Sequence, residues 1–587
     1  MHFQGIPASP GIAVGPLFLY MPDHAPIRRD PFTSASPDAE WHLVEVAIAH
    51  ARGQIIDLRE TVTQRTSVEE AAIFDAHLLV LEDEELLNGM RDLITQQRLN
   101  AEAAVWDAMA VYREQLLAID DDYLRARAAD LEDIARRVIA CLRGEGQSTL
   151  TQIAQPSVIV ARDLLPSDTA GLNPAMTLAI VTELGGPTAH TAILARQMGI
   201  PAVVGATGIV AAAAQAINAA PVTLALDGAS GVVEVNPTTD VIVGYLAQRD
   251  ARHAQRAHFE ADARQPAIMS DGRPIEIGAN VGQLRELPDV AQQGAQGIGL
   301  FRTEFLFLDR TSPPTEDEQF AAYREAAHHV AGGTVIIRTL DIGGDKVVPY
   351  LPLDHEDNPF LGVRGLRLCL TPAFQPLFKT QLRAILRAAS GGARLKVMFP
   401  MVNHSGEMHA ARVLLREAAA ELDGQGIAAS AVLEHLPVGA MIETPAAAFV
   451  ADQLADDCDF FSIGTNDLTQ YVLAIDRMNP TMAGHYTSFS PAVLRAIYHA
   501  VSMAHSRGRH VGMCGEMAGD PRAIPLLLGI GLDELSMVPP AIAEAKHVIR
   551  RCTQAGVSDL SRRAFALTSA EAVTALLEDH LRSIMAS

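Results

Sequence analysis

Eight short apolar runs recur after residue 270, and segments with helical periodicity separate most of them. Short runs rich in Val, Ile and Phe, bounded by turn residues, predict buried strands. Eight strand–helix units in succession predict a (β/α)8 barrel of the TIM type, so we expect a multidomain α/β protein that ends in this barrel. The runs cover residues 275–280, 297–301, 335–338, 396–399, 438–442, 460–463, 510–513 and 534–537.

Polar side chains stand where several of these runs end. Catalytic residues of TIM-type barrels lie at the C-terminal ends of the strands, so these side chains are expected to converge on one mouth of the barrel. Taken singly, each arginine is more often part of a surface ion pair and the cysteine more often a buried small residue, but their joint placement favours a site. The residues that end or follow a run are Arg302, Arg338, Glu443, Asn466, Asp467 and Cys514.

The chemistry of these side chains suits an anionic, phosphorylated ligand. Arg302, Arg338 and Arg364 offer planar guanidinium groups that match phosphate and carboxylate. Glu443 and Asp467 follow consecutive runs and are two carboxylates suited to a Mg²⁺ ion that completes its octahedron with ligand oxygens and water.

Three further residues complete this predicted site. Asn466 is a candidate to hold a phosphate oxygen, and Arg477 is a candidate to neutralise charge on a group in transfer. Cys514 carries a thiol that is able to donate a proton to a developing carbanion.

A second candidate site lies upstream, in residues 183–196. An apolar run at 176–182 predicts a strand, the Gly-Gly-Pro at 185–187 predicts a tight turn, and Thr188 is a predicted N-cap. His190 therefore falls in the first turn of a helix, where free N–H groups and the helix dipole favour an anion. An imidazole at this position is suited to phosphorylation, and the alternative is a histidine that only forms hydrogen bonds.

Length and composition limit the class of protein. A chain of 587 residues is too long for one core, and 49% hydrophobic with 20% charged residues describes a folded protein. The net charge of −24 argues against nucleic acid and anionic membranes and suits a basic protein partner. Five cysteines without a CxxC pair, no basic signal region and no apolar run of transmembrane length predict a soluble cytoplasmic protein.

Residues 36–144 differ in character from the rest, being nearly free of Gly and Pro and rich in Ala, Leu, Glu and Arg. This predicts a helical subdomain inserted between two β-containing segments. Asp83, Glu84 and Glu85 form either an acidic rim for a basic partner or a solvated helix end, and His77 is expected to pack or dock, not to catalyse. A long polar helix after Pro237, reaching about Arg264, is expected to bridge domains.

The motifs resemble those of one known family. Residues 185–196 resemble the phosphohistidine signature of the phosphoenolpyruvate-utilising enzymes, although Enzyme I proteins often have Arg in place of Pro187 and Ser in place of Ala189. The resemblance to Enzyme I of the bacterial phosphotransferase system spans essentially the whole chain. It is densest in residues 300–309, 338–345, 442–445, 464–470 and 512–516.

This resemblance implies four parts with separate tasks. They are a swivelling phosphohistidine domain (residues 1–20 and 150–236), a helical domain that binds the phosphocarrier HPr (21–149), a linker helix (237–266) and a barrel that binds phosphoenolpyruvate (267–587). The equivalents of the strand-end residues above would bind phosphoenolpyruvate and Mg²⁺, and Cys514 would protonate the enolate. The resemblance also implies a homodimer formed through the barrel.

The activity that the resemblance implies is transfer of a phosphoryl group from phosphoenolpyruvate through His190 to a histidine of HPr, with release of pyruvate, as the first step of sugar uptake. One alternative is the Enzyme I portion of a multiphosphoryl transfer protein. A phosphoenolpyruvate synthase or dikinase fits less well, because the segment before the histidine is helical and has no glycine-rich phosphate loop.

Overall fold

The computed structural model forms two compact units, residues 1–254 and 255–587. The structure describes residues 1–21, 26–32, 34, 36–65, 68–118, 122–144, 150, 153–165, 168–169, 172–186, 189–217, 221–308, 310–330, 332–343, 348, 350–351, 353, 356–477, 479 and 482–586. Each unit has its own hydrophobic core or cores.

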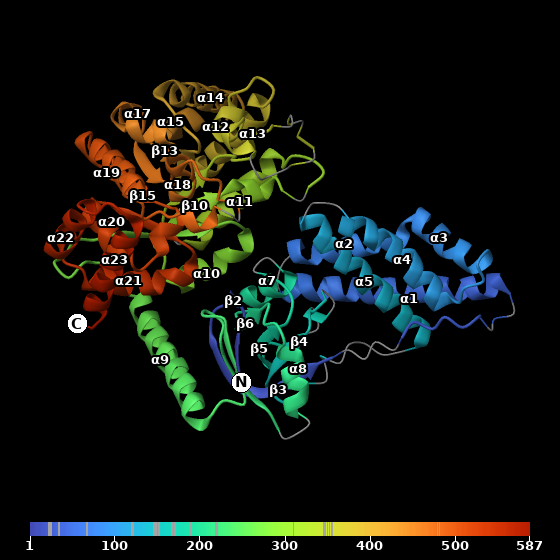
Figure 1. Ribbon diagram of the computed structural model, residues 1–587. Coiled ribbons are helices and arrows are strands. Elements are labelled where there is room, and N and C mark those ends of the chain that lie inside the picture. Colours follow the sequence, from blue (N-terminus) through green and yellow to red (C-terminus); the bar gives the residue numbers. More distant parts are fainter. Residues whose placement is uncertain are drawn as a thin grey trace. The chain divides into compact units, whose positions relative to one another are not determined.

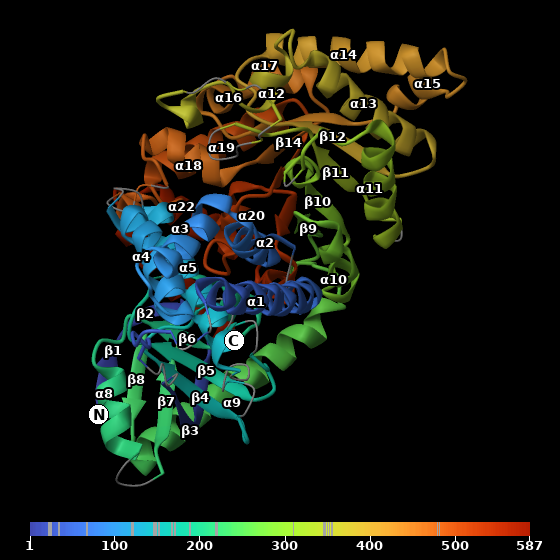
Figure 2. The same ribbon diagram turned by 90° about the vertical axis from the view of Figure 1, so that its right-hand side faces the viewer.

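The first unit contains a mixed eight-stranded sheet in the order β1-β8-β7-β3-β4-β5-β6-β2 (Figure 2). Strands β3 to β6 are parallel, and β7, β8, β1 and β2 pair antiparallel to their neighbours. The strands are β1 (His2–Gln4), β2 (Ile6–Ser9), β3 (Ile12–Tyr20), β4 (Ser157–Ala161), β5 (Thr177–Thr182), β6 (Ala202–Val204), β7 (Thr223–Asp227) and β8 (Val232–Val235).

Both faces of this sheet are covered, because its central strands alternate between two cores. Val158 and Val160 of β4 belong to a core that includes residues of helix α8 (Ile209–Ile217). Ile159 and Ala161, which point to the opposite face, belong to a core that includes helix α7 (His190–Gln197). The predicted α/β domain is therefore a sheet between two helical layers.

The same unit contains a bundle of long helices, as predicted for residues 36–144, with a core rich in alanine, isoleucine and valine. Helix α4 packs against α5, and α1 packs against both α2 and α5. The near absence of Gly and Pro lets these helices run without interruption. They are α1 (Pro37–Arg65), α2 (Val68–Glu82), α3 (Glu84–Thr95), α4 (Ala101–Ala118) and α5 (Asp122–Arg143).

The second unit is a closed barrel of eight parallel strands, in which β16 pairs with β9. The predicted (β/α)8 barrel is confirmed, and each predicted strand agrees with the observed one to within one residue at either end. The strands are β9 (Glu276–Val281), β10 (Gly297–Arg302), β11 (Val335–Arg338), β12 (Leu395–Phe399), β13 (Val438–Ile442), β14 (Phe460–Ile463), β15 (His510–Met513) and β16 (Glu534–Met537).

Helices lie around the outside of these strands (Figure 1). Within the part of the chain that the structure describes, no helix is both long and apolar enough to cross a membrane. The helices of the barrel unit are α10 (Leu287–Gln292), α11 (Glu316–His329), α12 (Gly365–Cys369), α13 (Gln375–Ser390), α14 (Ser405–Asp423), α15 (Ala429–Leu433), α16 (Pro445–Phe449), α17 (Ala451–Asp457), α18 (Thr465–Leu473), α19 (Pro491–Ser506), α20 (Ile524–Ile530), α21 (Ile542–Arg551), α22 (Gln554–Phe565) and α23 (Ala570–Ala586).

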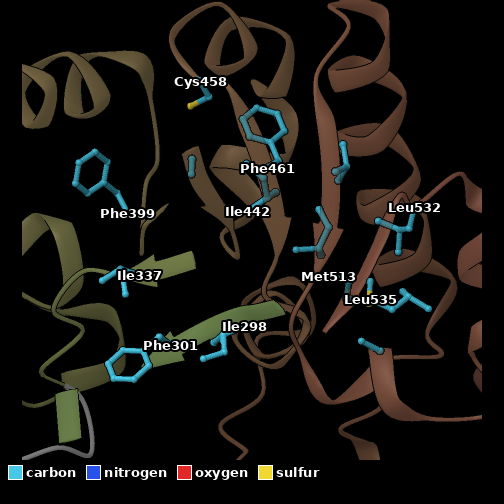
Figure 3. Close-up of a cluster of buried hydrophobic side chains, with 14 of the residues drawn as sticks. Ile298, Phe301, Ile337, Phe399, Ile442, Cys458, Phe461, Met513, Leu532 and Leu535 are labelled. Atoms are coloured by element: carbon cyan, nitrogen blue, oxygen red, sulfur yellow. The ribbon is translucent and has the colours of Figure 1, made fainter. Parts of the chain in front are cut away.

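Side chains along the barrel strands alternate between two clusters. Ile337 and Phe399 belong to the large cluster that includes residues of the surrounding helices (Figure 3). Their strand neighbours Ile336 and Met398 belong to a small separate cluster, which also contains Cys514. Since successive side chains of a strand point to opposite faces, the small cluster fills the barrel interior.

The predicted polar helix after Pro237 is α9 (Thr239–Ala263), which crosses the boundary between the units at residues 254 and 255. Its C-terminal end is anchored to the barrel unit. Phe259 and Ala263 are buried together with Ala543 of α21. The Lys546 ammonium donates a hydrogen bond to the Ala263 carbonyl at 2.7 Å. The last turns of α9 therefore stabilise the barrel.

Two barrel fragments that differ only in these turns test this anchoring. Fragment 267–587 lacks Phe259 and is expected to unfold with a free energy at least about 3 kcal/mol smaller than that of fragment 255–587, because the removal of a buried aromatic side chain costs that much. Urea unfolding of both fragments, followed by circular dichroism, measures the difference. Equal stabilities would show that the end of α9 contributes nothing to the barrel.

Candidate active site

A cavity of about 440 Å³ opens at the C-terminal ends of the barrel strands. It is the place where the predicted strand-end residues meet, since residues at the ends of parallel strands share one rim of a closed barrel. Four arginines and five carboxylates line it, so their positive and negative charges nearly cancel. The predicted residues that line it are Arg302, Arg338, Arg364, Glu443, Asn466, Asp467, Arg477 and Cys514.

Two of the arginines are held by buried carboxylates. The Arg338 guanidinium donates to Glu304 Oε1 at 2.5 Å and lies 3.3 Å from Asp341 Oδ2. Arg364 Nη2 donates to both carboxylate oxygens of Asp341, at 3.0 and 3.2 Å, and Nη1 donates to Asp467 at 3.1 Å. The side chains of Glu304 and Asp341 are each 1% exposed. Paired charge-assisted bonds of this kind fix the orientation of both guanidinium planes.

A neutral hydrogen-bond network supports the same strand end from behind. Thr303 Oγ1 donates to the Arg338 carbonyl at 2.8 Å, and Gln381 Nε2 donates to Thr303 Oγ1 at 3.0 Å. The Gln381 side-chain oxygen accepts from the Leu340 N–H at 2.9 Å, and Gln381 Nε2 also donates to the Tyr323 hydroxyl at 3.2 Å. These groups are buried, so the satisfied network restricts the backbone that carries Arg338.

The other two arginines differ in their surroundings. Among the described residues, neither Arg302 nor Arg477 has a carboxylate ion-pair partner. The Arg477 guanidinium carbon lies 5.8 Å from the centre of the Phe360 ring, an arrangement that does not neutralise its charge. The cavity therefore contains two arginines already engaged with carboxylates and two that remain available to an anionic ligand.

The residues predicted to hold a cation fit that task in this structure. Glu443 is buried, and one of its carboxylate oxygens accepts from the Met401 N–H at 2.6 Å. Burial, followed by repulsion from Asp467 and Asp341, raises the pKa of Glu443 to about 8. Carboxylates crowded together in this way destabilise one another, and a divalent cation between Glu443 and Asp467 would offset the repulsion.

Asn466 is positioned by a reciprocal contact with Glu516. Asn466 Nδ2 donates to Glu516 Oε1 at 3.0 Å, and the Glu516 N–H donates to Asn466 Oδ1 at 3.1 Å. The Tyr486 hydroxyl donates to the Asn466 carbonyl at 2.8 Å. These bonds hold the first turn of α18 at the cavity rim. A phosphate oxygen at this rim would share the Asn466 amide with Glu516.

Cys514 follows β15 and is only 3% exposed. Its carbonyl accepts from Asn280 Nδ2 at 2.9 Å, and Ser536 Oγ donates to Asn280 Oδ1 at 2.7 Å, which ties the cysteine to β9 and β16. Burial is the main cause that raises the pKa of Cys514 to about 11, while Ser462, Arg338 and Arg302 oppose the rise. The thiol is therefore protonated at neutral pH, the state that a proton donor requires.

His190 belongs to the first unit, where it begins α7 as predicted. Ala189 occupies the N-cap position without a side-chain hydrogen bond, and the predicted cap Thr188 lies outside the described residues. The helix is anchored on both sides, since Thr191 Oγ1 donates to the Leu164 carbonyl and Arg196 donates twice to the Ala8 carbonyl. The first turn of α7 is thus tied to the loop that follows β4, and its last turn is tied to β2.

The predicted docking residues lie in the helical bundle, and they differ in exposure. His77 is 2% exposed and packs edge-on against Phe74, so it offers almost no surface to a partner, which favours packing over docking. Asp83 caps α3 by accepting from the Leu86 N–H at 2.8 Å. Glu84 and Glu85 are exposed in the first turn of α3.

Known proteins match this chain over nearly its whole length. Three family profiles match: PEP-utilising enzyme, N-terminal (residues 4–127), mobile domain (153–231) and PEP-binding domain (256–554). A phosphoenolpyruvate-protein phosphotransferase of Geobacillus stearothermophilus is 42% identical over 98% of this chain and 97% of that protein. The protein of that name in Bacillus subtilis is 40% identical over 98% of this chain and 99% of that protein. The chain belongs to the phosphoenolpyruvate-protein phosphotransferase family.

Among solved structures, a chain titled "NMR solution structure of Enzyme I (nEIt) protein using two 4D-spectra" has 32% sequence identity with this one. It covers 43% of this chain and 99% of its own length, with a TM-score of 0.37.

Four polar residues that line the cavity at the strand ends of this chain were not predicted from the sequence: Glu304, Asp341, Tyr486 and Glu516. The first two stand close to predicted arginines, in Arg302-Thr-Glu304 and Arg338-Thr-Leu-Asp341. An acidic residue two or three positions after a strand-end arginine is the signal that could have indicated them.

The protonated state of Cys514 can be measured directly in metal-free buffer. Because burial raises the pKa of Cys514 to about 11, the difference in thiolate ultraviolet absorbance between the wild type and Cys514→Ser should show no step between about pH 6 and pH 9. A titration step within this window would show that Cys514 is a thiolate near neutral pH and unsuited to proton donation.

Proposed function

We propose that this chain transfers the phosphoryl group of phosphoenolpyruvate to His190 and then to a histidine of the phosphocarrier HPr, releasing pyruvate. The observation that carries the proposal is the cavity in which four arginines and a pair of crowded carboxylates converge at the strand ends. The relatives that share about 40% of the sequence over nearly the full length bear the name phosphoenolpyruvate-protein phosphotransferase.

The arginines divide the work of binding a substrate that has a phosphate and a carboxylate. Arg302 and Arg477, which have no carboxylate partner among the described residues, would receive the anionic groups with the strongest net attraction. Arg338 and Arg364 are oriented by Glu304 and Asp341 before any substrate arrives. Such preorganised positive charge stabilises a transferring phosphoryl group without reorganisation of the protein.

Glu443 and Asp467 would hold Mg²⁺, whose chemistry when bound is to neutralise charge on the phosphoryl oxygens and the enolate. The residues of the chain perform the remaining steps. A ring nitrogen of His190 forms a bond to phosphorus while the bond from phosphorus to the enol oxygen breaks, and the electron pair leaves with the enolate. The Cys514 thiol then donates its proton to the enolate carbon, which gives pyruvate, and the thiolate takes a proton from water.

We propose that the chain has the domain arrangement of the family. Residues 1–20 and 150–236 carry the phosphohistidine, residues 21–149 dock HPr, residues 237–266 link the units and residues 267–587 bind phosphoenolpyruvate. The acidic rim for HPr is formed by Asp83, Glu84 and Glu85, and the net charge of −24 favours a basic carrier. The proposal includes a cytoplasmic location, where phosphoenolpyruvate is made, and a homodimer formed through the barrel.

The direct test of the proposal is phosphate uptake by His190→Ala. The wild-type chain with Mg²⁺ and labelled phosphoenolpyruvate should take up about one acid-labile, base-stable phosphate, and His190→Ala should take up none. His2→Gln is the control, because His2 is an exposed histidine of the same unit, 2.8 Å from Glu234. Labelling that survives in folded His190→Ala would contradict the assignment of His190.

The docking role of the acidic rim is tested by Glu84→Lys. Glu84 is exposed, and reversal of its charge should lower kcat/KM for HPr by roughly fivefold at low salt, with the loss shrinking at high salt, because rim charges act mainly on the association rate. Phosphate uptake from phosphoenolpyruvate should stay unchanged. Glu434→Lys, at an exposed position of the barrel unit, is the matched control. An equal loss in both variants would argue against docking at α3.

A further inference from the structure

A second group of polar side chains lies at the opposite end of the barrel from the candidate active site. Glu276, His510 and Glu534 are the first residues of β9, β15 and β16. These strands are parallel neighbours, in the order β15-β16-β9, and Glu534 is in register with Glu276. The three side chains therefore share the N-terminal rim, while the cavity that contains Cys514 lies at the C-terminal rim.

Glu534 is the unusual member of this group. It is only 7% exposed, and among the described residues its carboxylate has no hydrogen-bond or ion-pair partner. Glycines make the space for it, since a Cβ at Gly299 would lie 2.4 Å from Glu534 Oε1 and a Cβ at Gly278 would lie 3.0 Å away. A buried carboxylate without a partner is costly unless it takes up a proton or meets a cation, so this cradle favours a cationic ligand.

The geometry of the group suits a metal ion. One carboxylate oxygen from each glutamate and one ring nitrogen of His510 all lie within 4.8 Å of one another. His510 Nε2 is 3.8 Å from Glu276 Oε2, too far for a hydrogen bond. Ligand atoms around a tetrahedral Zn²⁺ are about 3.3 Å apart, so small rotations of the side chains would complete the site. Glu276 and Glu534 also line a cavity of about 280 Å³, which has room for a water ligand.

Two cationic side chains line the same cavity: Arg394, which donates to the Gly332 carbonyl at 2.6 Å, and Lys396 of β12. Its ammonium lies 5.3 Å from the centre of the Phe460 ring and forms no ion pair within 4.0 Å of Glu534 among the described residues. Lys396 therefore lowers the net negative charge of the site without occupying it. The positive charge of Lys396 repels a bound cation. An ion that binds imidazole well would overcome this repulsion more readily than Mg²⁺, which prefers oxygen ligands alone.

We propose that Glu276, His510 and Glu534 form a binding site for a divalent transition-metal cation, with Zn²⁺ as the preferred ion. The bound ion would join three neighbouring strands at the place where the last strand of the barrel closes on the first. The bound ion would increase the stability of the barrel. This metal site is independent of the phosphotransfer proposed above.

The test uses the full chain with Glu443→Gln and Asp467→Asn as the parent, so that the carboxylates of the other rim cannot hold the added ion. Zinc binding is measured by competition with a chromophoric chelator, and thermal unfolding is measured with zinc and with EDTA. The parent should bind about one Zn²⁺ in the micromolar range, and its Tm should rise by a few degrees with zinc. His510→Gln or Glu534→Gln, added to the parent, should weaken this binding at least about tenfold and abolish the shift in Tm.

The matched control is His404→Gln in the same parent. His404 is an exposed histidine 3.9 Å from Glu407, so it resembles the His510–Glu276 pair in distance but has no buried carboxylate beside it. This control should keep both the bound zinc and the shift in Tm. If Glu534→Gln fails to fold, as judged by circular dichroism, His510→Gln provides the test, because His510 is partly exposed. Unchanged zinc affinity in His510→Gln, or no micromolar zinc binding by the parent, would overturn the proposal.

Discussion

The carboxylate of Asp341 is the interaction on which the candidate active site depends. It contacts the guanidinium groups of both Arg338 and Arg364, and all three side chains are buried. Loss of one partner from such a group leaves an uncompensated buried charge, which costs several kcal/mol. Asp341 therefore sets the spacing between the guanidinium groups of Arg338, at the end of β11, and Arg364, at the N-cap of α12, and Glu304 and Asp467 complete the arrangement.

The proposed function divides the chemistry between the two units. The barrel holds the arginines, the crowded carboxylates and the protonated thiol of Cys514, and in the proposed function these groups activate phosphoenolpyruvate. The first unit holds His190 at the start of a helix that is fixed to a sheet. In the proposed function, the phosphoryl acceptor His190 thus belongs to one unit and the groups that activate phosphoenolpyruvate belong to the other.

Much of this architecture could be predicted because it depends on local patterns. The short apolar runs identified all eight barrel strands, and their ends identified Arg302, Glu443 and Cys514. Side-chain contacts between residues that are distant in the sequence could not be predicted. Nothing local shows that Thr303 contacts Gln381, or that His77 points into its bundle. The group at the N-terminal rim was missed for the same reason, since Glu534 is notable only once its burial and its glycine cradle are known.

The most direct test of the divided chemistry is phosphate exchange by residues 1–254 alone, a compact unit with its own cores. We expect this fragment, once shown to be folded, to accept labelled phosphate from phosphorylated HPr at His190 and to return it, yet to take none from phosphoenolpyruvate. Uptake from phosphoenolpyruvate by the fragment would contradict the account, because the donor site would then lie outside the barrel. Refusal of phosphate from HPr would equally contradict it.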